Sequence, residues 1–209
     1  MTSSEPDWVV WARRLRAIAQ TGLEFAPSEY DRERYREILQ IAEDIFARHT
    51  LVEHPQIRDF FAFDVTGYAT PQIDVRGGIF DADKVLLVRE RLDGLWTLPG
   101  GYADVNTSPR EAVEREIFEE SGYRARAVKL AMLYDKRFHG HPPSPRHSYK
   151  AFFLCERTGG EPRTSYETTD IRFFPVTDLP DLSLPRVTAS QIQRLYEHHL
   201  RRDLPTDFD

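Results

Sequence analysis

Apolar residues recur at helical spacing in the first third of the chain and at strand spacing over much of the remainder. Residues 7–20 place apolar side chains three and four positions apart, which predicts an amphipathic helix interrupted by Gly22 and Pro27. Ser28 is a suitable N-cap for a second helix over 29–49, whose apolar residues again share one face. The beginning of the chain is therefore expected to be helical.

These helices are too small to bury much apolar surface by themselves. A third, short helix is predicted within 50–63 and a linker at 67–71, so we expect a small all-α N-terminal domain over 1–66 and a second domain over 67–209. The apolar faces must dock on the second domain or on another subunit, and we expect a homodimer. A DNA-binding module is the rival interpretation, but residues 1–65 carry twelve acidic residues against eight arginines and no basic stripe.

The rest of the chain alternates strand patterns with helical ones. Five runs predict β-strands: 72–80, 84–90, 125–136, 149–156 and 171–176. The first two flank a turn and are expected to form a hairpin, and Gly159 and Gly160 are expected to break the fourth. A terminal helix is predicted over 187–201, followed by a mobile tail over 203–209. Strands around one internal and one C-terminal helix predict an α/β/α sandwich with a mixed sheet.

The internal helix has clear start and stop signals in the sequence. Ser108 and Glu111 form a capping box, and Pro109 takes the first helical position, where a missing N–H has no cost. Gly122 suits the left-handed position after the last helical residue. The helix is therefore predicted to cover 109–121.

Three carboxylates crowd the last turns of this helix: Glu116, Glu119 and Glu120. They repel one another, the helix dipole disfavours them there, and Arg115 is the only cation in the last two turns. Mg²⁺ and Mn²⁺ prefer oxygen ligands, and two glutamates one turn apart can share an ion. A solvated acidic face is the ordinary alternative, but the preceding Gly100–Gly101 turn and the helix cap favour a metal site.

Residues 101–123 resemble the signature of the Nudix hydrolases. In that signature a glycine is followed after five residues by a glutamate and after seven more by Arg-Glu-aliphatic-x-Glu-Glu-x-Gly and an aliphatic or aromatic residue. The chain reads Arg-Glu-Ile-Phe-Glu-Glu-Ser-Gly-Tyr over 115–123, but Thr107 replaces the first glutamate. A Nudix subgroup with a helical N-terminal extension is similar in this loop, and its members cleave ADP-ribose or CDP-choline.

The resemblance implies a Nudix-type α/β/α sandwich and a metal-dependent pyrophosphohydrolase. Mg²⁺, with Mn²⁺ as a substitute, would be held by Glu116, Glu120 and the backbone carbonyl of Gly100. Arg115 would orient a neighbouring glutamate through a bidentate hydrogen bond. The substrate would be a nucleoside diphosphate linked to another group, such as ADP-ribose or CDP-choline, and the products a nucleoside monophosphate and a phosphorylated compound.

Two glutamates are candidates for activating the attacking water. Glu119 belongs to the helix, whereas Glu167 begins a polar loop that precedes the last core strand, with Asp170 as a second choice there. In some Nudix enzymes a glutamate from a loop of this kind binds metal or activates water. The sequence leaves the choice between Glu119 and Glu167 open, and an ordinary polar loop is the alternative for Glu167.

Basic side chains are expected around a site that binds pyrophosphate. Four are candidates for binding the substrate: Arg76, Arg89, Lys136 and Arg137. Each is equally consistent with an ordinary surface cation. His139 and His141 could bind zinc, but their spacing is loose and no cysteine joins them, so we expect their loop at the rim of the substrate cleft.

Composition narrows the remaining alternatives. The formal net charge of −6 disfavours nonspecific binding to nucleic acid, and no apolar run is long enough to span a membrane. Cys155 is the only cysteine, which together with the absence of a signal-peptide pattern indicates a cytoplasmic protein. Two other function classes remain as alternatives: a Nudix-fold ligand sensor, favoured by Thr107, and an interaction module built on the N-terminal helices.

Overall fold

The computed structural model describes residues 6–49, 67–104 and 106–209. The chain divides into two compact units, Met1–Pro71 with Pro143–His147 and Gln72–Pro142 with Ser148–Asp209. The boundary expected at residue 66 stays a prediction, and the helix predicted within 50–63 lies outside the described residues. Within the described ranges, no helix has both the length and the apolar character needed to cross a membrane.

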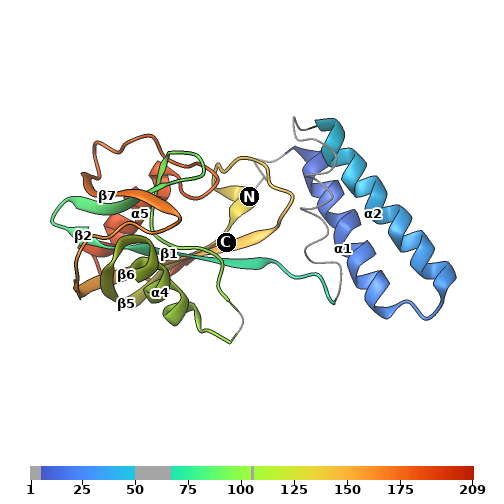
Figure 1. The fold of residues 1–209 in the computed structure, drawn as a ribbon, viewed down its shortest axis with the longest axis horizontal. Helices are drawn as coiled ribbons and strands as arrows, with labels where there is room; N and C mark the ends of the chain where they lie inside the picture. The colour runs from blue at the N-terminus through green and yellow to red at the C-terminus, as the bar shows by residue number, and fades with distance from the viewer. Residues whose placement is uncertain (1–5, 50–66, 105) are drawn as a thin grey trace. The chain divides into compact units, whose positions relative to one another are not determined.

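Within its described residues, the first unit contains two helices, α1 (Asp7–Phe25) and α2 (Glu29–His49). They lie side by side and run antiparallel (Figure 1). Their shared core contains Val9, Ala12, Ala42 and Phe46. Ser28 caps α2 by accepting a hydrogen bond from the Asp31 N–H at 3.2 Å, and the bounds of α2 are those predicted.

The expected interruption of α1 at Gly22 is wrong, because the helix continues to Phe25. A Cβ at Gly22 would fall 2.3 Å from the Tyr35 ring, so the glycine allows the two helices to approach closely. The absent side chain serves packing here, not helix termination.

The second unit contains two sheets, shown in Figure 1. One sheet has the order β1-β6-β5-β8, with the bounds Gln72–Gly78, Ser148–Gly160, Tyr123–Asp135 and Asp207–Phe208. The β1–β6 and β5–β8 pairs are parallel and the β5–β6 pair is antiparallel. The other sheet is antiparallel and contains β2 (Phe80–Asp81), β3 (Lys84–Glu90), β4 (Trp96–Thr97) and β7 (Thr168–Pro175).

Two helices supply side chains to the two apolar clusters of this unit. Helix α4 (Pro109–Ser121) contributes Val113 and Ile117 to one cluster, and α5 (Ala189–Leu200) contributes Ile192 and Leu195 to the other. A short 3₁₀ helix, η1 (Lys136–Phe138), follows β5. The predicted mixed α/β sandwich with helices at its N-terminus is confirmed.

Three expectations about strands need correction. The run 72–80 is not one strand, because β1 pairs with β6 while β2 turns back on β3, so only its end forms the predicted hairpin. Strand β6 continues through Gly159 and Gly160, which pair with the beginning of β5. The tail is ordered: β8 adds to the edge of β5, and Arg194 Nη2 donates to Asp207 Oδ1 at 2.9 Å.

Candidate active site

Helix α4 begins and ends as its sequence predicts. Ser108 Oγ accepts from the Glu111 N–H at 3.3 Å, and Glu111 Oε2 accepts from the Ser108 N–H at 2.9 Å. Gly122 closes the helix in the left-handed conformation, with φ of 75°. Ile117 is fully buried, which fixes the rotation of the helix about its axis. Because residues 116 and 120 lie one turn apart, their side chains then share one side of the helix.

The turn before α4 requires glycine. Gly100 has φ of 143°, and a Cβ there would fall 2.0 Å from the backbone oxygen of Val75. Backbone hydrogen bonds join the turn to β1: the Val75 N–H donates to Gly101 O at 2.8 Å and the Gly77 N–H donates to Pro99 O at 2.9 Å. The turn is therefore held along β1, the first strand of its sheet.

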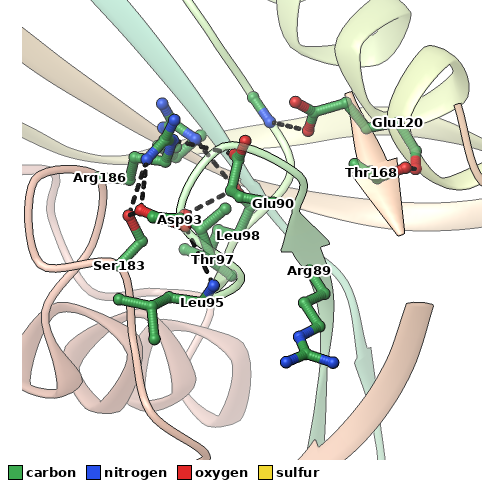
Figure 2. Close-up of polar contacts among 12 residues, drawn as sticks. Arg89, Glu90, Asp93, Leu95, Thr97, Leu98, Glu120, Thr168, Ser183 and Arg186 are labelled. Carbon is green, nitrogen blue, oxygen red and sulfur yellow. Dashed lines mark hydrogen bonds and ion pairs between the residues drawn. The ribbon is translucent and has the colours of Figure 1, made fainter. Parts of the chain in front are cut away.

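Two of the three helix glutamates meet this turn. The Gly100 N–H donates to Glu120 Oε2 at 2.8 Å, the contact drawn beside Glu120 in Figure 2. A Cβ at Gly101 would lie 3.3 Å from the Glu116 carboxylate, so that carboxylate also packs against the turn. The structure thus brings Gly100, Glu116 and Glu120 together.

Burial makes both of these glutamates difficult to ionise. Glu120 is 4% exposed, and burial, reinforced by the charges of Glu90 and Glu116, raises its pKa to about 8 in spite of Arg76 and the Gly100 N–H. Burial also raises the pKa of Glu116, although the Arg115 guanidinium opposes the shift. A divalent cation would favour the charged form of both carboxyls.

The donor set is consistent with a hard divalent metal. Glu116 and Glu120 supply carboxylate oxygens, and the glycine turn supplies backbone oxygen, which are ligands of Mg²⁺ or Mn²⁺. Within the described residues, no three His, Cys, Asp or Glu side chains are grouped as a metal site on their own. An ion held here would therefore need backbone oxygen or water in addition to the two glutamates.

Arg115 bridges three carboxylates. Its Nη2 lies 2.8 Å from Asp104 Oδ2 and 3.2 Å from Glu116 Oε1, while Nη1 lies 3.0 Å from Glu119 Oε2. This is a shared contact and not the bidentate pair with one glutamate that the resemblance implied. Asp104 was not predicted in this role, and Thr107 lies in the same loop, where its hydroxyl donates to Asp104 O at 2.6 Å.

Glu167 approaches the site from the start of β7. Its charge contributes to the raised pKa of Glu116 and of Glu90, so Glu167 acts electrostatically on both. Its backbone oxygen accepts from the Arg91 N–H at 2.7 Å. The next residue, Thr168, donates its hydroxyl to Glu120 O at 2.8 Å, which joins this loop to α4 (Figure 2).

The predicted substrate-binding cations are placed differently from one another. Arg76 is 4% exposed; its Nε donates to Asp74 Oδ1 at 2.7 Å and its Nη1 to Leu98 O at 3.1 Å. Its contact with substrate stays a prediction that burial disfavours, because the guanidinium supports the residues leading into the glycine turn. Arg89 is exposed, and its Nε donates to Gly94 O at 2.7 Å.

The other two candidate cations lie in η1. Arg137 Nε donates to both oxygens of Asp135 at 3.0 Å, and Lys136 is half-buried beside it. The structure therefore places this pair directly after the end of β5. Their role in binding substrate stays a prediction.

The two loop histidines make separate structural contacts. His141 Nδ1 lies 2.7 Å from Leu184 O and its Nε2 lies 2.9 Å from Gln191 Nε2, and burial lowers its pKa to about 3. A neutral ring with Nδ1–H donating satisfies both contacts. His139 stacks on Tyr134, with ring centroids 3.8 Å apart. A shared zinc ion is not supported.

A buried chain of charges was missed in the sequence. Lys150 on β6 is fully buried, and its Nζ lies 2.6 Å from Asp74 Oδ2. Arg76 lies on the other side of Asp74 and acts electrostatically on Glu90 and Glu120. A lysine inside the apolar run of β6 was the available signal, because an isolated cation at an inward position needs a buried partner.

Family comparisons cover both parts of the chain. A family model described as a NUDIX domain matches residues 70–196, and one described as a UDP-X-like, N-terminal oligomerisation domain matches residues 6–61. A Bacillus subtilis (strain 168) protein named a putative ADP-ribose pyrophosphatase is 42% identical over 209 residues, which is 100% of each chain.

Solved structures agree with this. A crystal structure of a UDP-X diphosphatase is 30% identical, with a TM-score of 0.63, and covers 97% of this chain and 98% of that chain. An ADP-ribose pyrophosphatase from Streptococcus suis is 40% identical, with a TM-score of 0.62, over 67% of this chain and 100% of that chain. Sequence and fold therefore point to the same group of proteins.

Proposed function

The chain belongs to the Nudix family of hydrolases, and we propose that it is a Mg²⁺-dependent pyrophosphohydrolase of nucleoside diphosphates linked to another group. The products would be a nucleoside monophosphate and a phosphorylated compound. ADP-ribose and UDP-linked compounds are the first substrates to consider, because the relatives described above are named for them, and CDP-choline is the third.

One observation carries this proposal. Glu116 and Glu120 both lie against the Gly100–Gly101 turn, with a 2.8 Å hydrogen bond from the Gly100 N–H to Glu120. We propose that these two carboxylates and the Gly100 carbonyl hold Mg²⁺, with Mn²⁺ as a substitute. The ion would supply charge screening for the pyrophosphate and stabilise charge on the leaving oxygen.

The two candidates for the general base, Glu119 and Glu167, differ in the contacts of their carboxylates. Arg115 Nη1 occupies one oxygen of Glu119 at 3.0 Å. The carboxylate of Glu167 makes no hydrogen bond within the described parts of the chain, and it is exposed. We therefore favour Glu167 for taking the proton of the attacking water, with Glu119 as the alternative. Arg115 would hold Glu116 and Glu119 in place.

We also propose that the protein is a homodimer assembled through its N-terminal helices. Large apolar side chains of α1 are exposed within the first unit, among them Trp11, Ile18 and Phe25. Such a face needs a partner, and the family model that matches this region is described as an oligomerisation domain. Light scattering on the purified chain tests this, and a monomer at micromolar concentration would contradict it.

We also propose a cytoplasmic location, which is consistent with the buried free thiol of Cys155.

Product analysis tests the reaction. ADP-ribose, a UDP-sugar and CDP-choline are incubated with Mg²⁺, with Mn²⁺ or with chelator, and nucleoside monophosphate release is measured. We expect metal-dependent turnover of one substrate class and a loss of at least roughly 100-fold in kcat for Glu120→Gln. Glu167→Gln and Glu119→Gln are compared to assign the base. Turnover by Glu120→Gln at the wild-type rate would reject the metal site.

A ligand sensor is the second function to test, because Thr107 replaces the signature glutamate. It predicts thermal stabilisation by a nucleotide ligand without release of any product. Metal-dependent turnover excludes it.

A further inference from the structure

A cation from the C-terminal part of the second unit is paired with a carboxylate of β3 and with one in the turn after β3. Arg186 Nε lies 3.0 Å from Glu90 Oε1, and its Nη1 lies 2.9 Å from Asp93 Oδ2 and 2.8 Å from Ser183 Oγ. Figure 2 shows Arg186 with Glu90 on one side and Asp93 and Ser183 on the other. None of these four residues lies in the stretch 101–123 that resembles the Nudix signature.

The loop that carries Arg186 is fixed beside β4. The Trp96 N–H donates to Asp181 O at 3.0 Å, the Ser183 N–H donates to Trp96 O at 2.8 Å, and Ser183 Oγ donates to Asp93 Oδ2 at 2.7 Å. Strand β4 leads directly into the Gly100 turn. Arg186 is therefore held in position by the element that also positions the proposed metal site.

Glu90 connects Arg186 to that site. The Glu90 side chain is 8% exposed and is paired with Arg186. Glu90 pairs with Thr168 across β3 and β7, and the Thr168 hydroxyl donates to the Glu120 carbonyl. The residue before Thr168 is Glu167, so a short series of contacts links Arg186 to Glu120 and Glu167.

Arg186 differs from Arg76 and Arg115 in having donor groups to spare. Arg76 is buried under the turn, and Arg115 is shared among three carboxylates. Arg186 is 22% exposed, and its Nη2 donates no hydrogen bond within the described part of the chain. Two N–H groups on a guanidinium whose other nitrogens are fixed form a ready donor for an oxyanion.

We propose that Arg186 binds a phosphate of the nucleoside diphosphate through Nη2, and that Glu90 and Asp93 are positioning residues for it. This inference rests on the proposed function, because it assigns a further contact to the same substrate. A diphosphate that enters this region faces Glu90, Glu167 and the helix glutamates, and Arg186 is the cation that separates it from Glu90 and Asp93. Removing the guanidinium both deletes a charge-assisted bond and exposes the phosphate to two carboxylates.

Kinetics on Arg186→Gln and Arg186→Lys test this. We expect Arg186→Gln to raise KM for the substrate roughly 10- to 100-fold with a much smaller change in kcat, and to raise the inhibition constant of inorganic pyrophosphate by a similar factor. Arg186→Lys keeps the charge without the planar fork and should fall between the wild type and Arg186→Gln. Arg126→Gln is the matched control, because it removes an exposed ion pair with Glu156, which makes no contact with Arg186, Glu90 or Asp93 among those described.

A purely structural role gives a different result. It would lower Tm and kcat in Arg186→Gln and leave KM and pyrophosphate inhibition unchanged, which overturns the inference. If Arg186→Gln does not fold, the KM of Arg186→Lys decides, and a value equal to the wild type also overturns it. If the wild type hydrolyses none of the substrates, the proposed function fails separately. Calorimetric titration of Mg²⁺-pyrophosphate into wild type and variant then tests the inference: weaker binding by the variant supports it, and equal binding rejects it.

Discussion

Raising the pH is expected to destabilise the metal-free protein through one carboxyl group. Burial raises the pKa of Glu120 to about 8 in the folded chain from its ordinary value of 4.5. Between these values the folded chain keeps a proton that the unfolded chain has released. The folded state therefore binds more protons, and the free energy of unfolding falls as the pH rises through this window. The contribution is fully present below pH 4.5 and lost above pH 8.

The expected effect is large enough to measure. Each pH unit inside the window costs about 1.4 kcal/mol, so the loss attributable to Glu120 between pH 5 and pH 7 is on the order of 3 kcal/mol. Glu116 and Glu90 change stability in the same direction, because burial raises the pKa of each. Mg²⁺ that binds the charged carboxylates should restore about 3 kcal/mol when its concentration reaches about 100 times Kd.

Urea denaturation at pH 5, 6, 7 and 8, in chelator and in Mg²⁺, measures both effects. Glu120→Gln is neutral at every pH, so its unfolding free energy in chelator should depend less on pH than that of the wild type, and Mg²⁺ should stabilise it little. Glu119→Gln is the matched control, because this carboxylate is one residue away and exposed. Parallel pH profiles for wild type and Glu120→Gln in chelator would refute the reasoning.

Three further changes test the scaffold around the site by urea or thermal denaturation. Gly100→Ala places a Cβ 2.0 Å from a β1 carbonyl and should cost about 3 kcal/mol or more, whereas Gly140→Ala, which meets no atom within 4 Å, should cost about 1 kcal/mol from its backbone angle alone. Asp74→Asn leaves Lys150 buried without its counter-ion and should cost about 3–5 kcal/mol, part of which Lys150→Met in the same chain should recover. Deleting residues 203–209 removes β8 from the sheet edge and should cost roughly 1–3 kcal/mol; an unchanged Tm would mean that β8 does not form in solution.

The elements predicted to the residue are those whose ends are set by neighbours in sequence. The capping box and the terminal glycine defined α4, and Ser28 defined the start of α2. Strand pairing depends on residues far along the chain, so the split of 72–80 between two sheets and the addition of β8 to β5 had no local signal. Gly22 was predicted to interrupt α1 for the same reason, because its contact with the Tyr35 ring of the next helix cannot be recognised from the residues around it.

The residues of the candidate site also fall into those that are neighbours in the sequence and those that only the fold brings together. The glycine turn and the helix glutamates form one continuous stretch, and the sequence predicted that they would meet. Arg76 was predicted to bind substrate, although Asp74, two residues earlier on the same face of the strand, was an available sign of an ion pair; the contact with Leu98 O had no local signal. Glu90 and Arg186 lie almost a hundred positions apart, and each is an unremarkable charge until the fold brings them to 3.0 Å.

The arrangement of buried charge explains why Glu120 is unusual. Six charged side chains alternate in sign across the second unit: Asp93, Arg186, Glu90, Arg76, Asp74 and Lys150. Each carboxylate in this series has a cation beside it, and the series as a whole is neutral, so the burial cost of its charges is offset from within. Glu120 is as buried as Glu90, Arg76 and Asp74, but its closest described hydrogen-bond donor is the neutral backbone N–H of Gly100. The Arg76 charge attracts this carboxylate, but no described side chain forms an ion pair with it, and a divalent cation shared with Glu116 would supply a closer counter-ion.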